Sequence, residues 1–484
     1  MLDQRNDRWL THLATGLALL ALLFFALTVV RPLARLHTDG FAGYYTIGHI
    51  AVYTPEQLAL AYDEAWYGPQ VVLLTAPGVR EVFKNQPPPG SLLLAPLVWL
   101  PYPTARLVWL LLNLGFLVVS LMLLARAVRW PARAGLWIAP LCLLYRPVYE
   151  NLRQGQMYLW LLVWLCLALW ALATGPARPR AYALGGVMLG LLLIFKTAVI
   201  WLWPLLALAR RWQILLWGGI TAAAVALLSL FYFGLAPWRV YLDQMPLLFS
   251  MPDRYATGYQ TITSLFGHLF VAAPPFSPAP VAHLPALATA LTLTVQMTTL
   301  VITARGQRML GTDHAGRVLS LALLLSLAIA NAPLGEGYHY TLILPALLIA
   351  AWWAWTARLP WSQWALLALA ALLLSAPWPY QSPQLSAGWW ALLAYPRVYG
   401  AYALWGWLLG RRAEVRDQVN SRPLPPFSSP LCGEEKGSGV EVRPRITGSI
   451  TNSGAADPSP ALTLSSELVL RRTPPPAMSA QPQT

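Results

Sequence analysis

The chain has 484 residues, of which 57% are hydrophobic and only 11% are charged, and its formal net charge is +14. A soluble domain carries roughly 25% charged residues, so this composition excludes an ordinary soluble enzyme and indicates a polytopic membrane protein. The basic residues stand in short clusters between apolar segments, so we expect no nucleic-acid partner.

Apolar segments recur along the chain as far as Gly410. A helix needs about 20 apolar residues to cross the hydrocarbon core of a bilayer, and several of these segments are shorter. The segment 198–209 could be half of a broken helix, and the Pro-rich stretch 87–103 is typical of a re-entrant or interfacial element. The first segment lacks a small-x-small cleavage site, which favours an uncleaved anchor. We therefore expect an all-α bundle of about twelve membrane spans at 10–30, 104–125, 133–148, 156–174, 181–195, 198–209, 213–234, 283–304, 316–333, 340–357, 361–376 and 398–410.

The arginines between the spans predict the orientation of the chain. When the N-terminus is placed in the cytoplasm, nearly every inward loop is basic, as the positive-inside rule requires. Most acidic residues before residue 411 then fall on the opposite face. This distribution predicts a multi-pass protein of the plasma membrane with both termini in the cytoplasm. The long segments 31–103 and 235–282 would lie on the outer face, where we expect the active site.

The last segment, 411–484, differs from the membrane domain at 1–410. It is rich in Pro, Ser, Thr and Gly and has few large apolar residues, so we expect a disordered cytoplasmic tail. Part of it resembles the translation of a short intergenic repeat; an interaction tail is the alternative.

Asp39 is the candidate catalytic residue. It follows the first span closely, so its carboxylate would lie at the membrane–water boundary and could take a proton from an acceptor hydroxyl. The alternative is a helix cap or a solvated loop acid. Tyr44 and Tyr45 follow within one or two helical turns and could bind substrate, although interfacial tyrosines often only anchor a protein. Three further acids of this outer segment, Asp63, Glu64 and Glu81, are expected to be dispensable for turnover.

Lys196 interrupts a long apolar run and is the candidate phosphate-binding residue. A lysine at the edge of the membrane core requires an anionic partner or must reach a headgroup. Beside a polyprenyl phosphate, its charge would stabilise the leaving group. The alternative explanation is that the Lys196 side chain simply extends to the membrane–water interface.

Other polar residues at the outer ends of spans could complete a site. Arg153 and Gln156 begin the fourth span and suit phosphate or sugar hydroxyls, with helix-end solvation as the alternative. His339 opens the span at 340, with Glu336 close before it, and could bind phosphate or be structural. Gln260 belongs to a weaker polar group in the second outer segment.

Several motifs are absent from the sequence. It contains no GxxxxGK[ST] loop, no HExxH motif and no paired cysteine spacing, so we expect no cofactor and no metal site. No charged residue lies deep within a predicted span, which weighs against an ion-coupled transporter.

Taken in order, these segments resemble glycosyltransferase family 87, the polyprenol-phosphate-sugar-dependent membrane transferases of GT-C architecture. Three departures are that Gly40 follows the Asp where the family tends to place Phe, that the Asn-Gln-Ser loop appears only as Tyr259-Gln260-Thr261, and that the Lys-x-x-Pro pattern lacks its proline. The similarity extends over most of 1–410 and rests on Asp39, Phe41, Tyr44 and Tyr45; Pro87, Pro88, Pro96 and Pro101; Ala105, Arg106 and Trp109; Asn151, Leu152, Gly155 and Gln156; Gly186, Gly190 and Lys196; and His339 and Tyr340.

The resemblance implies an inverting hexosyltransferase. Asp39 would deprotonate a hydroxyl of a lipid or glycan acceptor, which attacks a sugar carried on polyprenyl phosphate. Lys196, Arg153 and His339 would hold the departing phosphate, and Tyr44, Tyr45, Gln156 and Gln260 would bind substrate. Mannose is the sugar for which the family is best known. A lipid or oligosaccharide transporter is the main alternative, and a structural assembly subunit is a third.

Overall fold

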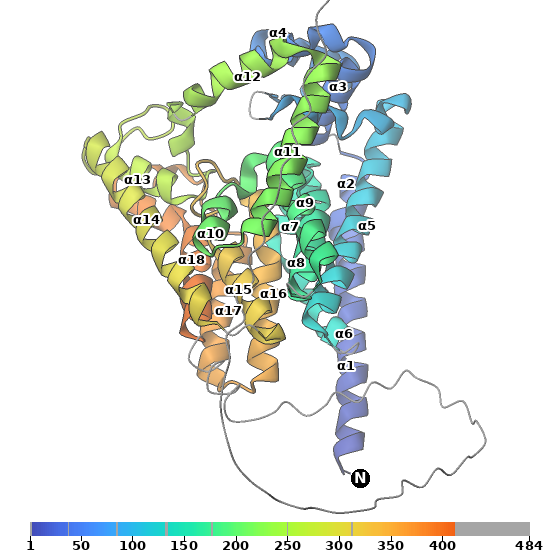
Figure 1. Ribbon diagram of the computed structural model, residues 1–484, viewed down its shortest axis with the longest axis vertical. Helices are drawn as coiled ribbons and strands as arrows, with labels where there is room; N and C mark the ends of the chain where they lie inside the picture. Colours follow the sequence, from blue (N-terminus) through green and yellow to red (C-terminus); the bar gives the residue numbers. More distant parts are fainter. Residues whose placement is uncertain are drawn as a thin grey trace, which may run out of the picture. The chain divides into compact units, whose positions relative to one another are not determined.

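The computed structural model describes residues 2–36, 38–83, 86–130, 134–175, 178–248, 250–310 and 313–411. Within these ranges the chain is helical, and its only β-type pairings are three isolated bridges (Figure 1). The expected all-α fold is therefore confirmed. The predicted tail lies outside the described residues from residue 412 onward.

Four segments of the described chain are long and apolar enough to cross a membrane. The shortest of them has 22 residues, which at a rise of about 1.5 Å per residue covers the roughly 30 Å hydrocarbon core. Their elements are α1 (Leu2–Phe25) continued by η1 (Ala26–Val30) and α2 (Arg31–Leu33), α5 (Tyr102–Val128), α11 (Trp212–Phe233) and α14 (Pro285–Met309).

Shorter helices, most of them apolar, fill the space between these four. Helix α5 packs on α8, α8 on α9 and α9 on α11, while α15 packs on α16 and α17 on α18. The twelve-span count and the GT-C arrangement stay predictions. These helices are α6 (Ala134–Leu144), α7 (Arg146–Gln154), α8 (Tyr158–Ala173), α9 (Pro179–Phe195), α10 (Leu202–Leu208), α15 (His314–Ser326), α16 (Leu344–Thr356), α17 (Trp361–Ser375) and α18 (Pro396–Gly410).

Short helices gather at the end of the bundle opposite the start of α1, where Figure 1 shows α3, α4 and α12 together. Helix α3 packs against η2, η3 and η4, and η2 packs against α12. The Pro-rich stretch 87–103 thus forms 3₁₀ turns under α3 rather than a span. The elements of this end are α3 (Asp39–Tyr53), η2 (Pro55–Tyr62), α4 (Glu64–Leu74), η3 (Pro88–Leu92), η4 (Ala95–Trp99) and α12 (Leu235–Leu248).

The remaining elements connect the spans. Helix α9 ends at Phe195, and α10 has only seven residues, so the segment 198–209 forms a short helix after a break. The other connecting elements are η5 (Thr197–Val199), η6 (Pro252–Tyr255), α13 (Ile262–Phe270), η7 (Gly337–Ile343), η8 (Pro383–Ser386) and η9 (Gly388–Ala394).

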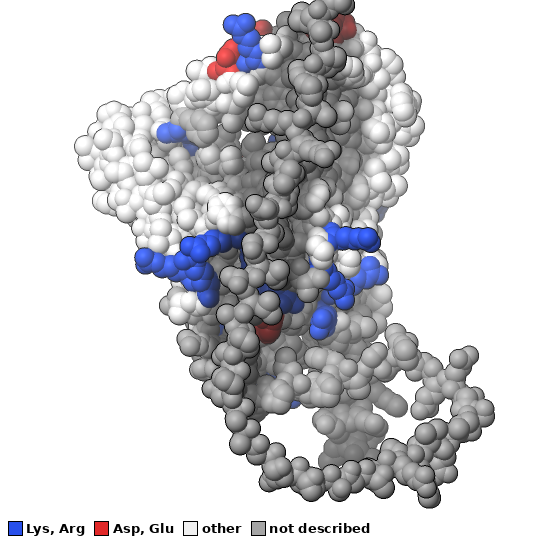
Figure 2. All heavy atoms as spheres, viewed as in Figure 1, with Lys and Arg blue, Asp and Glu red and all other residues white. Residues whose placement is uncertain are grey.

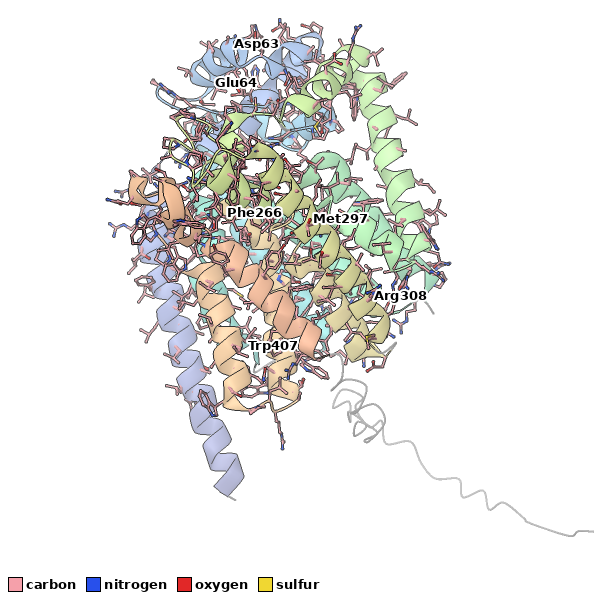
Figure 3. The ribbon with its side chains drawn as sticks, turned by 90° about the vertical axis from the view of Figure 1, so that its left-hand side faces the viewer. Asp63, Glu64, Phe266, Met297, Arg308 and Trp407 are labelled. Carbon is pink, nitrogen blue, oxygen red and sulfur yellow. The ribbon has the colours of Figure 1, made fainter. Side chains whose placement is uncertain are left out.

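Charge is distributed unevenly over the surface. Lys and Arg atoms form a band across the face drawn in Figure 2, whereas the acidic atoms in that view lie mainly at the end of α4 and α12. Figure 3 places Asp63 and Glu64 at this same end, with Arg308 and Trp407 toward the other. Lys and Arg atoms also lie beside the acidic atoms at that end in Figure 2, and the orientation expected from the sequence stays a prediction.

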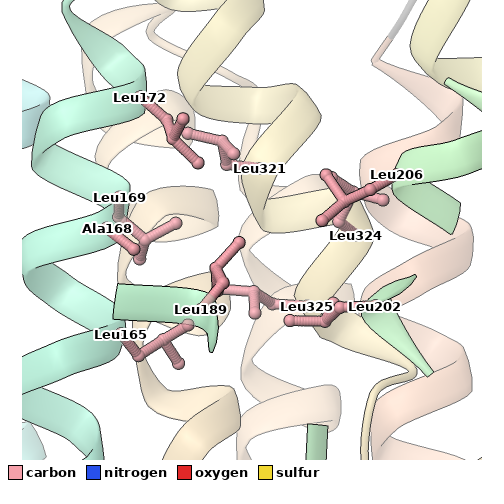
Figure 4. A pocket seen from close by; sticks show the side chains of 10 residues that line it. All are labelled: Leu165, Ala168, Leu169, Leu172, Leu189, Leu202, Leu206, Leu321, Leu324 and Leu325. Carbon is pink, nitrogen blue, oxygen red and sulfur yellow. The ribbon is translucent and has the colours of Figure 1, made fainter. Parts of the chain in front are cut away.

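The interior contains a small apolar pocket among α8, α9, α10 and α15 (Figure 4). Nine leucines and one alanine line it, so it offers no polar group to a substrate. The residues that could carry chemistry lie elsewhere, near the start of α3.

Candidate functional site

The turn between α7 and α8 supports the start of α3. Gly155 ends α7 with φ 67°, and a Cβ at this position would lie 2.5 Å from Oγ1 of Thr38. Its carbonyl accepts a hydrogen bond from Nε1 of Trp109 at 2.9 Å, and Asn151 Oδ1 accepts one from the Tyr158 N–H at 2.9 Å. Only glycine provides both the left-handed conformation and this close approach without strain.

The first turns of α3 face this junction with polar groups. The hydroxyl of Tyr44 donates to Oε1 of Gln156 at 2.6 Å, and both side chains are buried. A Cβ at Gly40 would lie 2.5 Å from Nε2 of Gln156 and 2.6 Å from the carbonyl oxygen of Gln154. The glycine that departs from the family pattern therefore lets α3 approach the turn.

The neighbouring Tyr45 has a different environment. Its hydroxyl donates to the carbonyl of Leu100 at 2.9 Å, and its ring packs on Phe41 and Tyr102. The structure thus places Tyr44 toward the polar junction and Tyr45 in an aromatic cluster under η4.

Asp39 is the first residue of α3, and its side chain is exposed. At a helix N-terminus, the unsatisfied N–H groups and the macrodipole stabilise a carboxylate. The negative charge of Asp39 acts on Glu81 and Tyr102, so all three groups lie in the same region. The exposed carboxylate is accessible to a second substrate.

Lys196 lies between the end of α9 and the start of η5, in the same region as Glu81. Its Nζ is 5.9 Å from the centroid of the Tyr158 ring, and its charge interacts with Glu81 and Glu336. Burial lowers the pKa of Lys196 to about 8, against the opposing effect of the two carboxylates. Lys196 thus interacts electrostatically with two carboxyl groups from distant parts of the chain.

Glu81 lies directly against α3. Its Cγ occupies the space that a Cβ of Gly43 would take, four residues after Asp39. Its Oε1 accepts a hydrogen bond from the Val82 N–H at 3.1 Å. Burial raises the pKa of Glu81 to about 7, and the negative charges of Glu336 and Asp39 act in the same direction while Lys196 opposes them.

The loop before η7 brings Glu336 and His339 to the cluster. The Glu336 carboxylate accepts hydrogen bonds from the backbone N–H of His339 and, at 2.9 Å, from the Tyr338 hydroxyl. Burial nevertheless raises the pKa of Glu336. Nδ1 of His339 accepts a bond from the Glu336 N–H at 2.6 Å, which assigns the ring proton to Nε2.

His339 is therefore a neutral imidazole. Burial, and next the charge of Lys196, lower its pKa well below the usual value. Its ring stands edge-on to Tyr158, with 4.3 Å between centroids. It can donate one hydrogen bond from Nε2 but does not supply a positive charge.

A buried ion pair holds this loop in place. Arg397 has an exposed fraction of 0%, and its NH1 and NH2 donate to the two carboxylate oxygens of Glu150 at 2.8 and 2.7 Å. The pair lies against the backbone of Gly337, where any side chain would collide with the guanidinium. The hydroxyl of Tyr145 also donates to the carbonyl of Tyr340 at 3.0 Å.

Within the described part of the chain, Gln260 and Arg153 make no hydrogen bond with Lys196 itself, although the Gln260 backbone N–H donates to the carbonyl of Gly335, directly before Glu336, at 2.7 Å. Gln260 is fully buried, and its Nε2 donates to the carbonyls of Thr257 and Ala394 at 2.8 and 2.7 Å, which connects two loops. Arg153 is exposed in the last turn of α7 and makes no side-chain hydrogen bond or ion pair within the described part of the chain.

Two buried polar atoms beside the cluster lack a partner among the described residues. These are the hydroxyl of Tyr158, which lies beneath Lys196, and Oε1 of Gln86, next to the loop that carries Glu81. Buried polar atoms are nearly always hydrogen-bonded in proteins, so both offer a hydrogen-bonding position to a ligand or water. The described His, Cys, Asp and Glu side chains form no group of three that could hold a metal ion.

Sequence reasoning missed Glu81, Glu150 and Arg397. No local motif marks any of them, and Glu81 was expected to be dispensable together with Asp63 and Glu64. The structure separates them, because Asp63 caps the exposed start of α4 whereas Glu81 joins Lys196 and Glu336.

The comparisons with known proteins identify a family. No curated protein and no solved structure matches the chain significantly. The model of glycosyltransferase family 87 matches residues 86–327, which is half of the chain and includes Glu150, Gln156 and Lys196. The chain therefore belongs to glycosyltransferase family 87.

Proposed function

We propose that this glycosyltransferase moves a hexose, with mannose as the first choice, from a polyprenyl-phosphate sugar to a lipid or glycan acceptor. The observation that carries the proposal is the position of Asp39, exposed at the edge of a half-buried cluster that contains Lys196. The acceptor would approach from the exposed side, and the donor phosphate would bind at the lysine.

In the proposed reaction, Asp39 accepts the proton of the acceptor hydroxyl as its oxygen forms a bond to the anomeric carbon. The bond from that carbon to the phosphate oxygen breaks, and the electron pair leaves with the polyprenyl phosphate. Attack from the face opposite the leaving group inverts the anomeric configuration. Lys196 and the Nε2–H of His339 stabilise the charge that develops on the phosphate.

The setting follows from the same predictions. The arginine distribution favours a protein of the plasma membrane with both termini in the cytoplasm and the site on the outer face. A GT-C bundle of about twelve spans would place the start of α3 at the outer interface, where a lipid-linked donor and an extracytoplasmic acceptor can meet.

The test is the variant Asp39→Asn, assayed in membranes with polyprenyl phosphomannose and extracted lipid as a mixed acceptor pool. Loss of a general base typically lowers the rate on the order of 100- to 10,000-fold. Donor binding should survive, because the lost interaction forms as the acceptor attacks. Asp63→Asn is the matched control, since the amide still caps α4, and it should stay within a few-fold of wild type.

A transporter predicts another outcome. It needs no base, so Asp39→Asn would leave flux intact and no glycosylated product would form in wild type. Full transfer by Asp39→Asn would remove Asp39 from the mechanism.

A further inference from the structure

The charges around Lys196 do not balance. Three carboxylates interact electrostatically with one another or with Lys196: those of Asp39, Glu81 and Glu336. Among the described residues, Lys196 is the one cation whose charge acts on Glu81. Arg397 is neutralised by its bidentate pair with Glu150. With all three carboxylates ionised, these acids and Lys196 together carry two net negative charges, and Asp253 is a further acid that acts on Glu336.

A phosphate-bearing donor would add a further negative charge. Placing it beside ionised carboxylates at low dielectric is unfavourable, because like charges at short range repel strongly there. His339 cannot compensate, because its Nδ1 accepts a hydrogen bond and the ring is neutral. The described acids are also not arranged to share a metal ion. Proton uptake by one of these carboxylates lowers the negative charge without any additional ion.

The hydrogen bonds distinguish the two half-buried glutamates, Glu81 and Glu336. Glu336 accepts from the Tyr338 hydroxyl and the His339 N–H, and both bonds favour its ionised form. Glu81 accepts only from the N–H of its neighbour Val82 among the described residues. The proton is therefore better held by Glu81.

We propose, on the basis of the proposed function, that the site binds the polyprenyl-phosphate sugar together with one proton. Glu81 carries this proton, and its O–H donates a hydrogen bond to the bound phosphate sugar. The unpartnered Tyr158 hydroxyl and Gln86 Oε1 next to the cluster independently indicate a polar ligand at this place. A protonated Glu81 no longer repels the phosphate, and its O–H can donate a hydrogen bond.

The groups that face Glu81 define the pH range of the test. Asp39 and Tyr44 face it from α3, Tyr67 from α4, and Lys196 from the end of α9. Glu336 and Tyr259 face it from loops, and Tyr338 from η7. Burial raises the pKa of every one of these tyrosines, so they stay neutral. The pKa of Lys196 is about 8, so the measurement stays below this value.

The experiment measures binding of a short-chain polyprenyl phosphomannose to the full-length protein in detergent, without acceptor, from pH 6.0 to 7.5. With the pKa of Glu81 at about 7, a required proton weakens affinity about fourfold over this interval. Calorimetry in two buffers of different ionisation enthalpy should show uptake of most of one proton at pH 7.5.

Glu81→Gln is the decisive variant, because its amide donates a hydrogen bond at every pH. It should bind with the affinity of wild type at pH 6.0, change less than twofold with pH and take up no proton. Glu56→Gln, an exposed acid in the same segment, should reproduce the wild-type slope.

A flat wild-type profile, or an unchanged slope in Glu81→Gln, would overturn the inference while leaving the transferase intact. Loss of binding with EDTA would assign the neutralisation to a metal instead. If the protein bound this probe at no pH, both the assignment of a polyprenyl-phosphate donor and this inference would be refuted. Proton-linked binding without transfer to any acceptor would support the inference and refute the proposed reaction.

Discussion

The Arg397–Glu150 pair offers the sharpest test of how the site is held. Arg397→Met keeps an unbranched side chain of similar length but removes both hydrogen bonds, leaving the Glu150 carboxylate with Arg146 as its ion-pair partner. The Glu150 side chain is only 13% exposed, so water replaces the lost partner poorly. We expect a destabilised protein and a displaced Glu336–His339 loop.

The magnitude follows from the burial of the pair. Removing one partner of a buried ion pair costs about 3 to 5 kcal/mol, and the partial exposure of Glu150 favours the lower end. An unfolding entropy of about 2.1 cal/mol/K per residue over about 400 residues converts 3 kcal/mol into a fall of Tm by about 3 to 4 °C. Helices that persist in detergent reduce the unfolding entropy, which enlarges the shift.

The assay is thermal unfolding of purified protein in detergent, followed by tryptophan fluorescence. Arg146→Met is the matched control, because Arg146 contacts the same carboxylate at 3.3 Å from a partly exposed position and should contribute less than about 1 kcal/mol. The double variant Glu150→Leu, Arg397→Met should recover part of the loss, since no buried charge remains. Equal effects of Arg146→Met and Arg397→Met would refute the reasoning.

The other predictions concern donor binding, packing and orientation. Lys196→Ala should weaken donor binding, and Lys196→Arg should restore it only partly because a planar fork replaces a compact charge; unchanged donor dependence would leave the lysine as an interfacial anchor. Gly155→Ala should lower stability by at least about 1 to 2 kcal/mol, because alanine is strained at φ 67° and its Cβ meets Thr38; thermal unfolding checks this, and an unchanged Tm would contradict it. A reporter after Arg412 should read cytoplasmic and one near Gly68 outside, whereas an outward C-terminus would reverse the orientation. Truncation after residue 415 should leave activity intact, and a loss would assign the tail a role.

Local sequence was sufficient for the helical class and for many features of the site. Runs of apolar residues predicted α5, α11 and α14 nearly to their ends, because a helix of this length satisfies its own backbone and depends little on its neighbours. The break after Lys196 and the 3₁₀ turns of the Pro-rich stretch also follow from short-range residue preferences. The resemblance to the family grouped Asp39, Tyr44 and Gln156; in the structure the Tyr44 hydroxyl bonds Gln156, and Asp39 begins the helix that carries Tyr44.

Tertiary structure alone decided which charges share the site. Glu81 and Asp63 are both outer-segment acids, and only the packing of Glu81 on Gly43 separates their roles. Arg397 and Glu150 are 247 residues apart, so no local pattern could pair them. Electrostatic interactions depend on distance and burial in space, not on spacing along the chain, and these are settled only when the helices pack.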